Sequence, residues 1–201
     1  MIKSVVFDVG GVLLDWNPRH LYRGMFDGDD EAMERFLADI CSPAWNLSLD
    51  AGTPFAEGVG ELCHRFPEQA ALIAAYDLRW EDMVQGAFED TVDLARKLKA
   101  RGFPLYALTN FSCEKLALVR PRYDFFALFD AMVVSGEIGI VKPDPAIYRH
   151  LLERFNLVAD ETLFIDDSAV NVAGAAAAGL RTVHYCSATQ LNAALTRLGL
   201  L

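Results

Sequence analysis

The sequence predicts an α/β protein with a doubly wound parallel sheet and an inserted helical cap domain. Three observations carry this prediction. Residues 2–7 form a short, apolar, β-branched run typical of a buried strand. After residue 88, strand-like and helix-like segments alternate, which indicates a parallel sheet with helices on both faces. Residues 19–88 show helical periodicity with almost no strand-like run. We therefore expect a core domain over 1–18 and 89–201, and a cap domain over 19–88.

The composition is that of an ordinary globular protein with an acidic balance. The chain has 201 residues, of which 53% are hydrophobic and 23% charged, enough for a sizeable core. Its net charge of −10 repels the phosphate backbone of nucleic acids, so we expect no nucleic-acid partner. The same charge attracts divalent cations, and an anionic substrate would need a locally positive site.

The cysteines and the N-terminus predict a cytoplasmic protein. No pair of cysteines has the C-x-x-C or zinc-site spacing, so four reduced thiols are expected. No charged segment followed by an apolar one precedes the first strand, and no apolar run approaches the ~18 residues that span a bilayer. We therefore expect no signal peptide and no membrane association. The cysteines are Cys41, Cys63, Cys113 and Cys186.

Within the cap, three helices are expected. The first follows Asp29-Asp30, a good N-terminal cap, and carries apolar residues as far as Ile40. The second follows Thr53, with Pro54 at its first helical position. The third covers residues 72–80. The stretch between the first strand and the cap, residues 8–18, is expected to be a loop.

The core elements follow from the same reasoning. Gly102 ends a helix with acidic residues early and basic residues late, as the helix dipole favours. The alanine-rich stretch 173–178 is expected to pack closely on the sheet. Helices are predicted at 89–101, 112–119, 145–155, 170–178 and 188–198, and strands at 103–108, 132–134, 162–165 and 182–185.

Polar residues follow the predicted strands at the points where the strands end. The carboxyl ends of parallel strands open on one edge, where ligands bind in such folds. Gly10 and Gly11 follow the first of these residues and would let the backbone approach a ligand closely. The residues are Asp8, then Thr109 and Asn110, then Lys142 in the next loop, then Asp166 and Asp167.

This gathering of charges predicts metal-assisted phosphoryl chemistry. Three neighbouring carboxylates repel one another unless a cation compensates, and Mg²⁺ binds one or two carboxylates beside a substrate phosphate. Lys142 and the Thr109 hydroxyl could hold phosphate oxygens, and an Asp carboxylate could attack phosphorus. The sequence contains no G-x-S-x-G, H-E-x-x-H or G-x-x-x-x-G-K motif.

Four segments resemble, in order, the motifs of the haloacid dehalogenase-like (HAD) hydrolases. They are Val5–Leu13, Leu108–Asn110, Val141–Tyr148 and Phe164–Val172. The resemblance covers nearly the whole chain, and the Lys-Pro-Asp-Pro and Phe-Ile-Asp-Asp-Ser segments are its most specific parts. It implies a Rossmann-like core and a helical cap of subfamily I, and Trp45–Gly52 is similar to a recurrent cap segment.

The resemblance also implies a role for each motif residue. Asp8 would be the nucleophile. Mg²⁺ would be bound by Asp8, the backbone carbonyl of Gly10 and Asp167, with Asp166 acting through a water or from behind the ligands.

The remaining motif residues would support the metal and hold the substrate. Asn171 would support the metal region. Thr109, Asn110 and Lys142 would hold the transferring phosphoryl group, and the cap would exclude water and choose the substrate.

Gly10 departs from the pattern of the family. Most of its phosphatases carry a second Asp at this position as general acid and base, a role worth about 10²–10⁴-fold in rate. The chain is then a weak phosphatase, recruits another acid, or uses a leaving group that needs little protonation, such as a sugar esterified at its anomeric carbon. A subgroup similar to bacterial glucose-1-phosphate phosphatases shares this Asp-x-Gly start, and the chain resembles this subgroup most. Asp15 is close in sequence, but a surface or hairpin role suits it better.

We therefore predict a Mg²⁺-dependent phosphomonoester hydrolase that forms an aspartyl-phosphate. Its substrate would be a small phosphorylated metabolite, with sugar phosphates as one class, and the protein would be a monomer or homodimer. Two alternatives stay open. One is a haloacid dehalogenase, against which Gly10 and the Asp166-Asp167 pair argue. The other is a non-catalytic binding or regulatory homologue, supported only by the missing second Asp.

Overall fold

The computed structural model describes residues 1–201 and has a five-stranded parallel sheet at its centre. The strand order is β5-β4-β1-β6-β7, so β1 lies in the middle. The residue that follows β1 therefore emerges at the centre of the carboxyl edge. The predicted parallel α/β fold is confirmed. The strands are β1 Ser4–Phe7, β4 Leu105–Thr109, β5 Ala131–Val134, β6 Thr162–Asp166 and β7 Arg181–His184.

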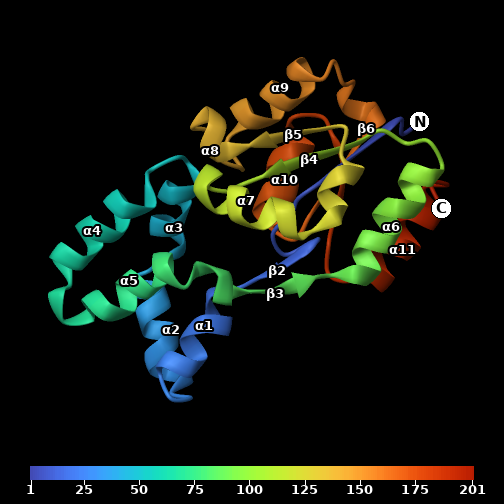
Figure 1. Cartoon of the computed structure of the whole chain (residues 1–201). Coiled ribbons are helices and arrows are strands. Elements are labelled where there is room, and N and C mark those ends of the chain that lie inside the picture. Colours follow the sequence, from blue (N-terminus) through green and yellow to red (C-terminus); the bar gives the residue numbers. More distant parts are fainter.

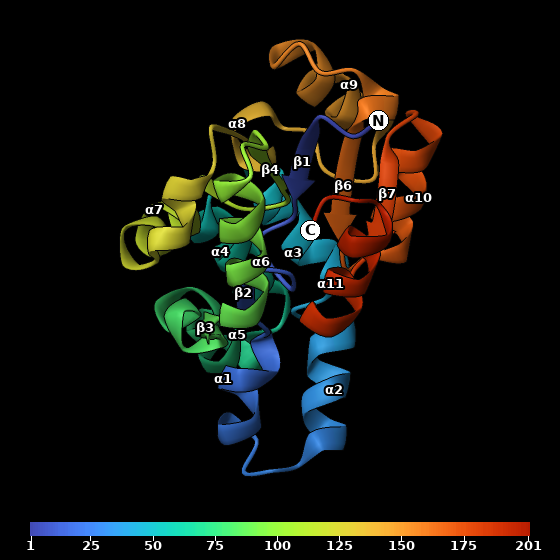
Figure 2. The ribbon, with the colours of Figure 1, turned by 90° about the vertical axis from the view of Figure 1, so that its right-hand side faces the viewer.

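Alternate residues of the strands face two separate helical layers. Val5 and Phe7 point into the larger apolar cluster, which includes residues of α6 and α11. Val6 points to the other face, into a cluster formed with α9 and α10. Figure 2 shows α6 and α11 side by side on the face turned to the viewer. The core helices are α6 Glu89–Ala100, α7 Cys113–Val119, α8 Ser135–Ile138, α9 Pro145–Arg154, α10 Ala169–Ala177 and α11 Ala188–Arg197.

The alanine-rich helix α10 packs closely against the sheet, as predicted. Ala175 is completely buried against the β1 and β6 side chains of the smaller cluster. At Gly174, a Cβ atom would lie 3.1 Å from Pro143 and from Tyr148 of α9. Small side chains are therefore needed for α10 to approach its neighbours this closely.

A group of helices lies to one side of the sheet (Figure 1). An aromatic cluster holds them together, with the ring of Tyr22 5.0 Å from that of Phe36 and 6.2 Å from that of Tyr76, between centroids. None of the helices in the protein is both long enough and apolar enough to cross a membrane. The helices of the group are α1 Pro18–Met25, α2 Asp30–Asp39, α3 Pro43–Asp50, α4 Phe55–Arg65 and α5 Ala70–Leu78.

Two of these helices were not predicted individually, although their starts carry clear signals. Helix α1 begins with a proline after Asn17, whose side chain accepts a hydrogen bond from the Arg19 backbone N–H. Helix α3 begins with a proline after Ser42, whose hydroxyl accepts from the Trp45 backbone N–H. Both are polar caps followed by proline at the first helical position. Short 3-10 segments occur at Pro67–Gln69, Trp80–Met83, Arg120–Arg122, Asp124–Leu128 and Ala159–Glu161.

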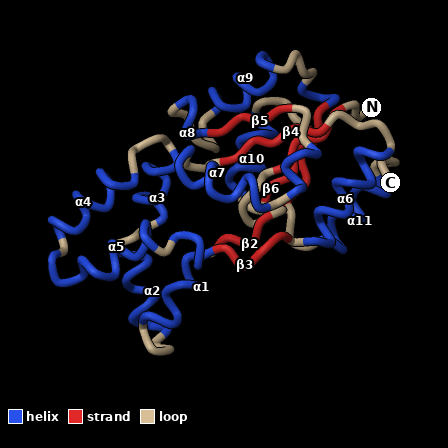
Figure 3. Tube along the Cα trace, viewed as in Figure 1, coloured by secondary structure: helices blue, strands red, loops and turns tan.

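A two-stranded antiparallel ribbon corrects the predictions for residues 8–18 and 84–87. Strand β2, Leu14–Trp16, lies in the predicted loop, and β3, Val84–Ala87, lies at the end of the predicted helical region. The ribbon runs between the helical group and the sheet (Figure 3). Each strand is short and depends on a partner distant in sequence, so neither has a clear local signal.

The start of α4 also differs from the prediction. Pro54 is the residue before the helix rather than its first residue, and no side chain caps it. Thr53 therefore does not cap the helix. Instead, the Phe55 backbone N–H donates to the carboxylate of Glu114 on α7, at 3.1 Å. This bond ties the start of α4 to the core.

Candidate active site

Asp8 stands at the centre of the carboxyl edge of the sheet. Its backbone N–H donates to the carbonyl of Ile165 on the neighbouring strand, at 2.9 Å, which continues the parallel pairing past β1. Its carboxylate accepts a hydrogen bond from the Val9 N–H at 2.7 Å. The residue is only 7% exposed. The sheet therefore presents one nearly buried carboxylate at its middle strand.

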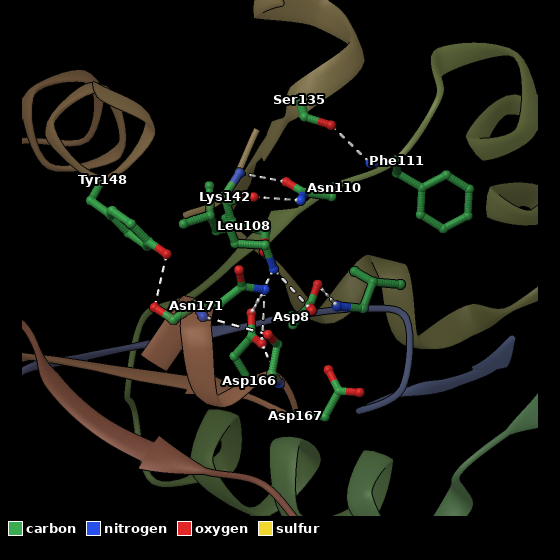
Figure 4. Close-up of polar contacts among 12 residues, drawn as sticks. Asp8, Leu108, Asn110, Phe111, Ser135, Lys142, Tyr148, Asp166, Asp167 and Asn171 are labelled. Carbon is green, nitrogen blue, oxygen red and sulfur yellow. Dashed lines mark hydrogen bonds and ion pairs between the residues drawn. The ribbon is translucent and has the colours of Figure 1, made fainter. Parts of the chain in front are cut away.

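Lys142 links Asp8 to the neighbouring strands. Its Nζ lies 2.9 Å from Oδ2 of Asp8 and 2.6 Å from Oδ2 of Asp166, and it donates to the Leu108 carbonyl at 3.0 Å (Figure 4). The side chain is 1% exposed, so this ammonium is buried with three oxygen partners. All three donors of the ammonium are therefore used, which offsets part of the cost of burying its charge.

The side chain of Asn110 fixes the backbone of Lys142. Its amide nitrogen donates to the Lys142 carbonyl at 3.0 Å, and its amide oxygen accepts from the Lys142 N–H at 2.8 Å. The resemblance to the family implies that Asn110 holds phosphate, and this role stays a prediction. In the structure, both ends of its amide are engaged with Lys142, so its side chain positions the lysine.

Asp166 is fully buried, and both of its oxygens accept hydrogen bonds. Oδ1 accepts from the Ser168 N–H at 2.8 Å and from the Asn171 amide at 3.1 Å, while Oδ2 accepts from Lys142. The Asn171 carbonyl in turn accepts from the Tyr148 hydroxyl at 2.8 Å. Asp166 therefore anchors Lys142 and Asn171 from behind the site.

Asp8, Asp166 and Asp167 each offer a carboxylate oxygen, and these oxygens lie within 4.8 Å of one another. Asp167 is exposed, whereas the other two are buried. Carboxylate oxygens are the hard donors that Mg²⁺ prefers, and one open side leaves room for water or phosphate. The residues present therefore fit a divalent cation of this kind.

The electrostatics of the cluster show a deficit of positive charge. Burial raises the pKa of Asp8 to about 8, with further increases from Asp166 and Asp167, although Lys142 opposes the shift. Burial and Asp166 also raise the pKa of Asp167. Burial alone would lower the pKa of Lys142, but Asp8 and Asp166 raise it overall. One lysine does not balance three carboxylates, and a cation would.

Thr109 carries an unsatisfied hydroxyl at this edge. The residue is 1% exposed, and its Oγ1 has no hydrogen-bond partner. A buried hydroxyl without a partner costs about 1–3 kcal/mol. A phosphoryl oxygen next to Thr109 would supply the missing partner.

Gly11 is required by its contact with Asp167. Its φ is +75°, and a Cβ atom there would lie 2.4 Å from Oδ2 of Asp167. At Gly10, by contrast, a Cβ atom would meet nothing within 4 Å. Residue 11 is therefore closed to side chains, whereas residue 10 faces open space.

A Gly11→Ala variant is expected to unfold at a lower temperature and to lose stabilisation by Mg²⁺. The left-handed backbone costs a side chain about 1–2 kcal/mol, and the new methyl displaces the Asp167 carboxylate. Thermal unfolding with and without Mg²⁺ measures both effects. The matched control is Gly60→Ala in α4, where a Cβ meets nothing within 4 Å and the helix should gain about 1 kcal/mol. An unchanged Mg²⁺ response in Gly11→Ala would contradict this interpretation.

The helical group contributes to a pocket that sequence reasoning missed. The pocket lies between Gly10, the segment after β4 and helices α3 and α4. Asp50 and Lys115 border it, and neither was predicted as a site residue. The resemblance of Trp45–Gly52 to a cap segment was the only signal for Asp50. Asp15 is not at this pocket, and its carboxylate lies 2.9 Å from the His20 ring.

Comparisons with known proteins by sequence and by fold indicate one family of hydrolases. A family model described as haloacid dehalogenase-like hydrolase matches residues 2–179. A sesquiterpene phosphatase from Aspergillus oryzae is 29% identical, over 90% of this chain and 89% of its own. A D-ribitol-5-phosphate phosphatase from Bacteroides thetaiotaomicron is 27% identical, over 86% of each.

A solved structure shares the fold. It is a HAD family enzyme from B. thetaiotaomicron in complex with magnesium and inorganic phosphate, with a TM-score of 0.70 and 23% identity over 93% of this chain and 96% of that one. Haloacid dehalogenases also occur among the relatives. Because the family model spans most of its length, the chain belongs to the haloacid dehalogenase-like hydrolases.

Proposed function

We propose that the chain is a Mg²⁺-dependent phosphomonoester hydrolase that forms an aspartyl-phosphate on Asp8. The observation that carries the proposal is the Asp8–Lys142 pair, 2.9 Å apart, together with the unpartnered hydroxyl of Thr109 at the end of the neighbouring strand β4. Asp8 would supply the carboxylate nucleophile, and Lys142 and Thr109 would supply a cation and a hydroxyl donor for the phosphoryl group. The names of relatives that act on phosphorylated compounds support the same chemistry.

The metal would be held by Asp8, Asp167 and the backbone carbonyl of Gly10, with Asp166 behind them. When bound, Mg²⁺ would neutralise charge on the phosphoryl group and on the carboxylates. Lys142 would contribute its ammonium on the other side of Asp8, and Asn110 would keep it there.

The reaction then follows from the residues at the edge. A carboxylate oxygen of Asp8 attacks phosphorus, and the bond between phosphorus and the leaving oxygen breaks. Lys142 and Thr109 stabilise the charge on the transferring group. A water molecule attacks the phosphorus of the aspartyl-phosphate, which releases inorganic phosphate and restores the Asp8 carboxylate.

Residues 19–88 would act as a cap that closes over the substrate. Helices α3 and α4 and the Trp80–Met83 segment supply one wall of the pocket, with Phe55 and Trp80 as aromatic residues. Trp16 and Phe111 supply aromatic surface from the ribbon and the core. Such walls suit the apolar face of a sugar ring or a hydrocarbon group. Sugar phosphates esterified at the anomeric carbon are our first candidates, as in the glucose-1-phosphate phosphatase-like subgroup.

A phosphate-release assay on a panel of phosphoesters tests the proposal. The panel includes anomeric and primary sugar phosphates, phosphoglycolate, prenyl phosphates and an aryl phosphate, each with Mg²⁺ and with EDTA. We expect at least one substrate to be hydrolysed with Mg²⁺ and none with EDTA. Halide release from 2-haloacids without metal would favour the dehalogenase alternative. Binding without turnover across the panel would favour the non-catalytic one.

A further inference from the structure

Asp50 is a carboxylate of the helical group that borders the core pocket. It is the last residue of α3 and is half-buried. It lines the same cavity as Gly10 of the core. A titratable group thus lies in a pocket that reaches Gly10, two residues after Asp8, and is separate from the cluster of Asp8, Asp166 and Asp167.

The Asp50 side chain is held in place by a short hydrogen-bond chain. Oδ2 accepts from the Asn46 amide at 2.8 Å, and the Asn46 oxygen accepts from the Tyr76 hydroxyl at 2.8 Å. The Tyr76 ring is almost fully buried, so it is a fixed support. The geometry therefore restrains the carboxylate rather than leaving it free on the surface.

The end of α3 is also fastened to the core. The Ser135 hydroxyl donates to the Asp50 carbonyl at 2.5 Å and accepts from the Phe111 backbone N–H at 2.9 Å. A Cβ atom at Gly52, whose φ is +107°, would lie 3.2 Å from the Gly136 carbonyl. The chain at Asp50 therefore contacts the start of α8, directly after β5, and Ser135 connects it to the segment that follows β4.

The space in front of Gly10 is open. A Cβ atom on residue 10 would meet nothing within 4 Å, and Gly10 lines the pocket that Asp50 borders. No acid is attached to the core at this point, so a proton donor for the leaving group has to come from another wall. Asp50 is the only carboxylate among the residues that line this cavity.

We propose that Asp50 is the general acid and base of the reaction, supplied by the helical group in place of a residue at position 10. The inference rests on the proposed phosphatase function. The Asp50 carboxyl proton passes to the leaving oxygen as its bond to phosphorus breaks. The Asp50 carboxylate then takes a proton from water as the water oxygen attacks the aspartyl-phosphate, which returns Asp50 to its starting form.

The protonation behaviour of Asp50 agrees with this role. Burial raises its pKa to about 7, although the Ser112 backbone, the Asn46 amide and Lys142 lower it. A general acid works best when its pKa is near the operating pH. The other ionisable groups around the pocket are Tyr76 on α5, Lys115 on α7 and Asp77, with which Lys115 is paired.

An Asp50→Asn variant separates acid catalysis from a structural role. Phosphate release is measured from 4-nitrophenyl phosphate, whose leaving group needs little protonation, and from a primary alkyl phosphate, whose leaving group needs much. We expect kcat/KM to fall about 10²-fold or more on the alkyl ester and less than about 5-fold on the aryl ester. Asp39→Asn, an exposed carboxylate on α2 outside the pocket, is the matched control and should change neither.

The pH profile and a rescue variant give two further readouts. In the wild type, kcat/KM for the alkyl ester should fall as the pH rises above about 7, because Asp50 loses its proton. In Asp50→Asn that dependence should disappear. Adding Gly10→Asp to Asp50→Asn places an acid in the open space. The double variant should hydrolyse the alkyl ester at least about 10-fold faster than Asp50→Asn does.

The outcomes distinguish this inference from the proposed function. Equal losses on both esters, or no loss on the alkyl ester, would overturn the role of Asp50 while leaving the phosphatase proposal standing. If the wild type releases phosphate from no ester of the panel in an Asp8-dependent way, the proposed function fails and the role of Asp50 fails with it. If Asp50→Asn does not fold, the role of Asp50 is tested by measurements on the wild type alone. Its aryl-to-alkyl rate ratio must rise between pH 6 and pH 9, and a constant ratio overturns the role.

Discussion

An Asp8→Asn variant is expected to lose Mg²⁺-dependent phosphate release by about 10⁴-fold or more, as removal of a covalent nucleophile does in other enzymes. The amide has the same shape and can still accept from the Val9 N–H, but it cannot form the aspartyl-phosphate. The stability of the variant, in contrast, should be equal to or higher than that of the wild type. Burial and two nearby carboxylates raise the pKa of Asp8, so an uncharged side chain removes repulsion within the cluster.

Two measurements check this prediction. Phosphate release is followed for wild type and variant on the best substrate of the panel, and thermal unfolding is followed at pH 8.5 without metal, where Asp8 is more ionised. We expect the variant to be inactive and at least as stable as the wild type. Activity within about 10-fold of wild type would show that Asp8 is not the nucleophile.

Replacing Lys142 with Met is expected to damage both stability and activity. The buried ammonium lies 2.9 Å from Asp8 and 2.6 Å from Asp166, and its removal leaves two buried carboxylates without a cation. Breaking a buried ion pair in this way costs about 3–5 kcal/mol. Loss of a preorganised charge at the phosphoryl group should also lower kcat by about 10²–10³-fold.

The stability loss should depend on pH. The pKa of Asp8 is already raised, and without Lys142 it rises further, so the carboxyl group becomes neutral as the pH falls. The free energy of unfolding, measured in urea, should therefore show a smaller deficit at pH 5 than at pH 8. Lys99→Met is the control, because Lys99 forms a surface pair with Asp130 at 2.7 Å and should cost at most about 1 kcal/mol. A deficit that is equal at both pH values would argue against uncompensated carboxylates as its cause.

Much of the edge could be predicted because most of its residues lie at the end of a strand or directly after it. Parallel strands bring Asp8, Thr109 and Asp166 to one place whatever lies between them in the chain. Lys142 could be added because it lies in the loop after the next predicted strand. Its complete burial and its bond to the Leu108 carbonyl could not be predicted, since they depend on packing around the loop.

Other features had no signal in the local sequence. The side chain of Asn110 binds backbone atoms of Lys142, and every residue type has such atoms, so nothing in the sequence marks the contact. The ribbon of β2 and β3 forms only when two short, distant segments meet. Asp50 reaches the pocket because the end of α3 contacts Ser135 and Gly136. These segments are far apart in the chain, so the contact cannot be predicted locally.

Detection of a phosphorylated Asp8 tests the central claim most directly. The wild type is mixed with the best substrate of the panel and Mg²⁺, quenched in acid within the first turnover, digested and analysed by mass spectrometry. We expect a phosphoryl group on the peptide that contains Asp8, absent with EDTA and absent in Asp8→Asn. Steady release of phosphate with no phosphorylated Asp8 peptide at any quench time would contradict the account.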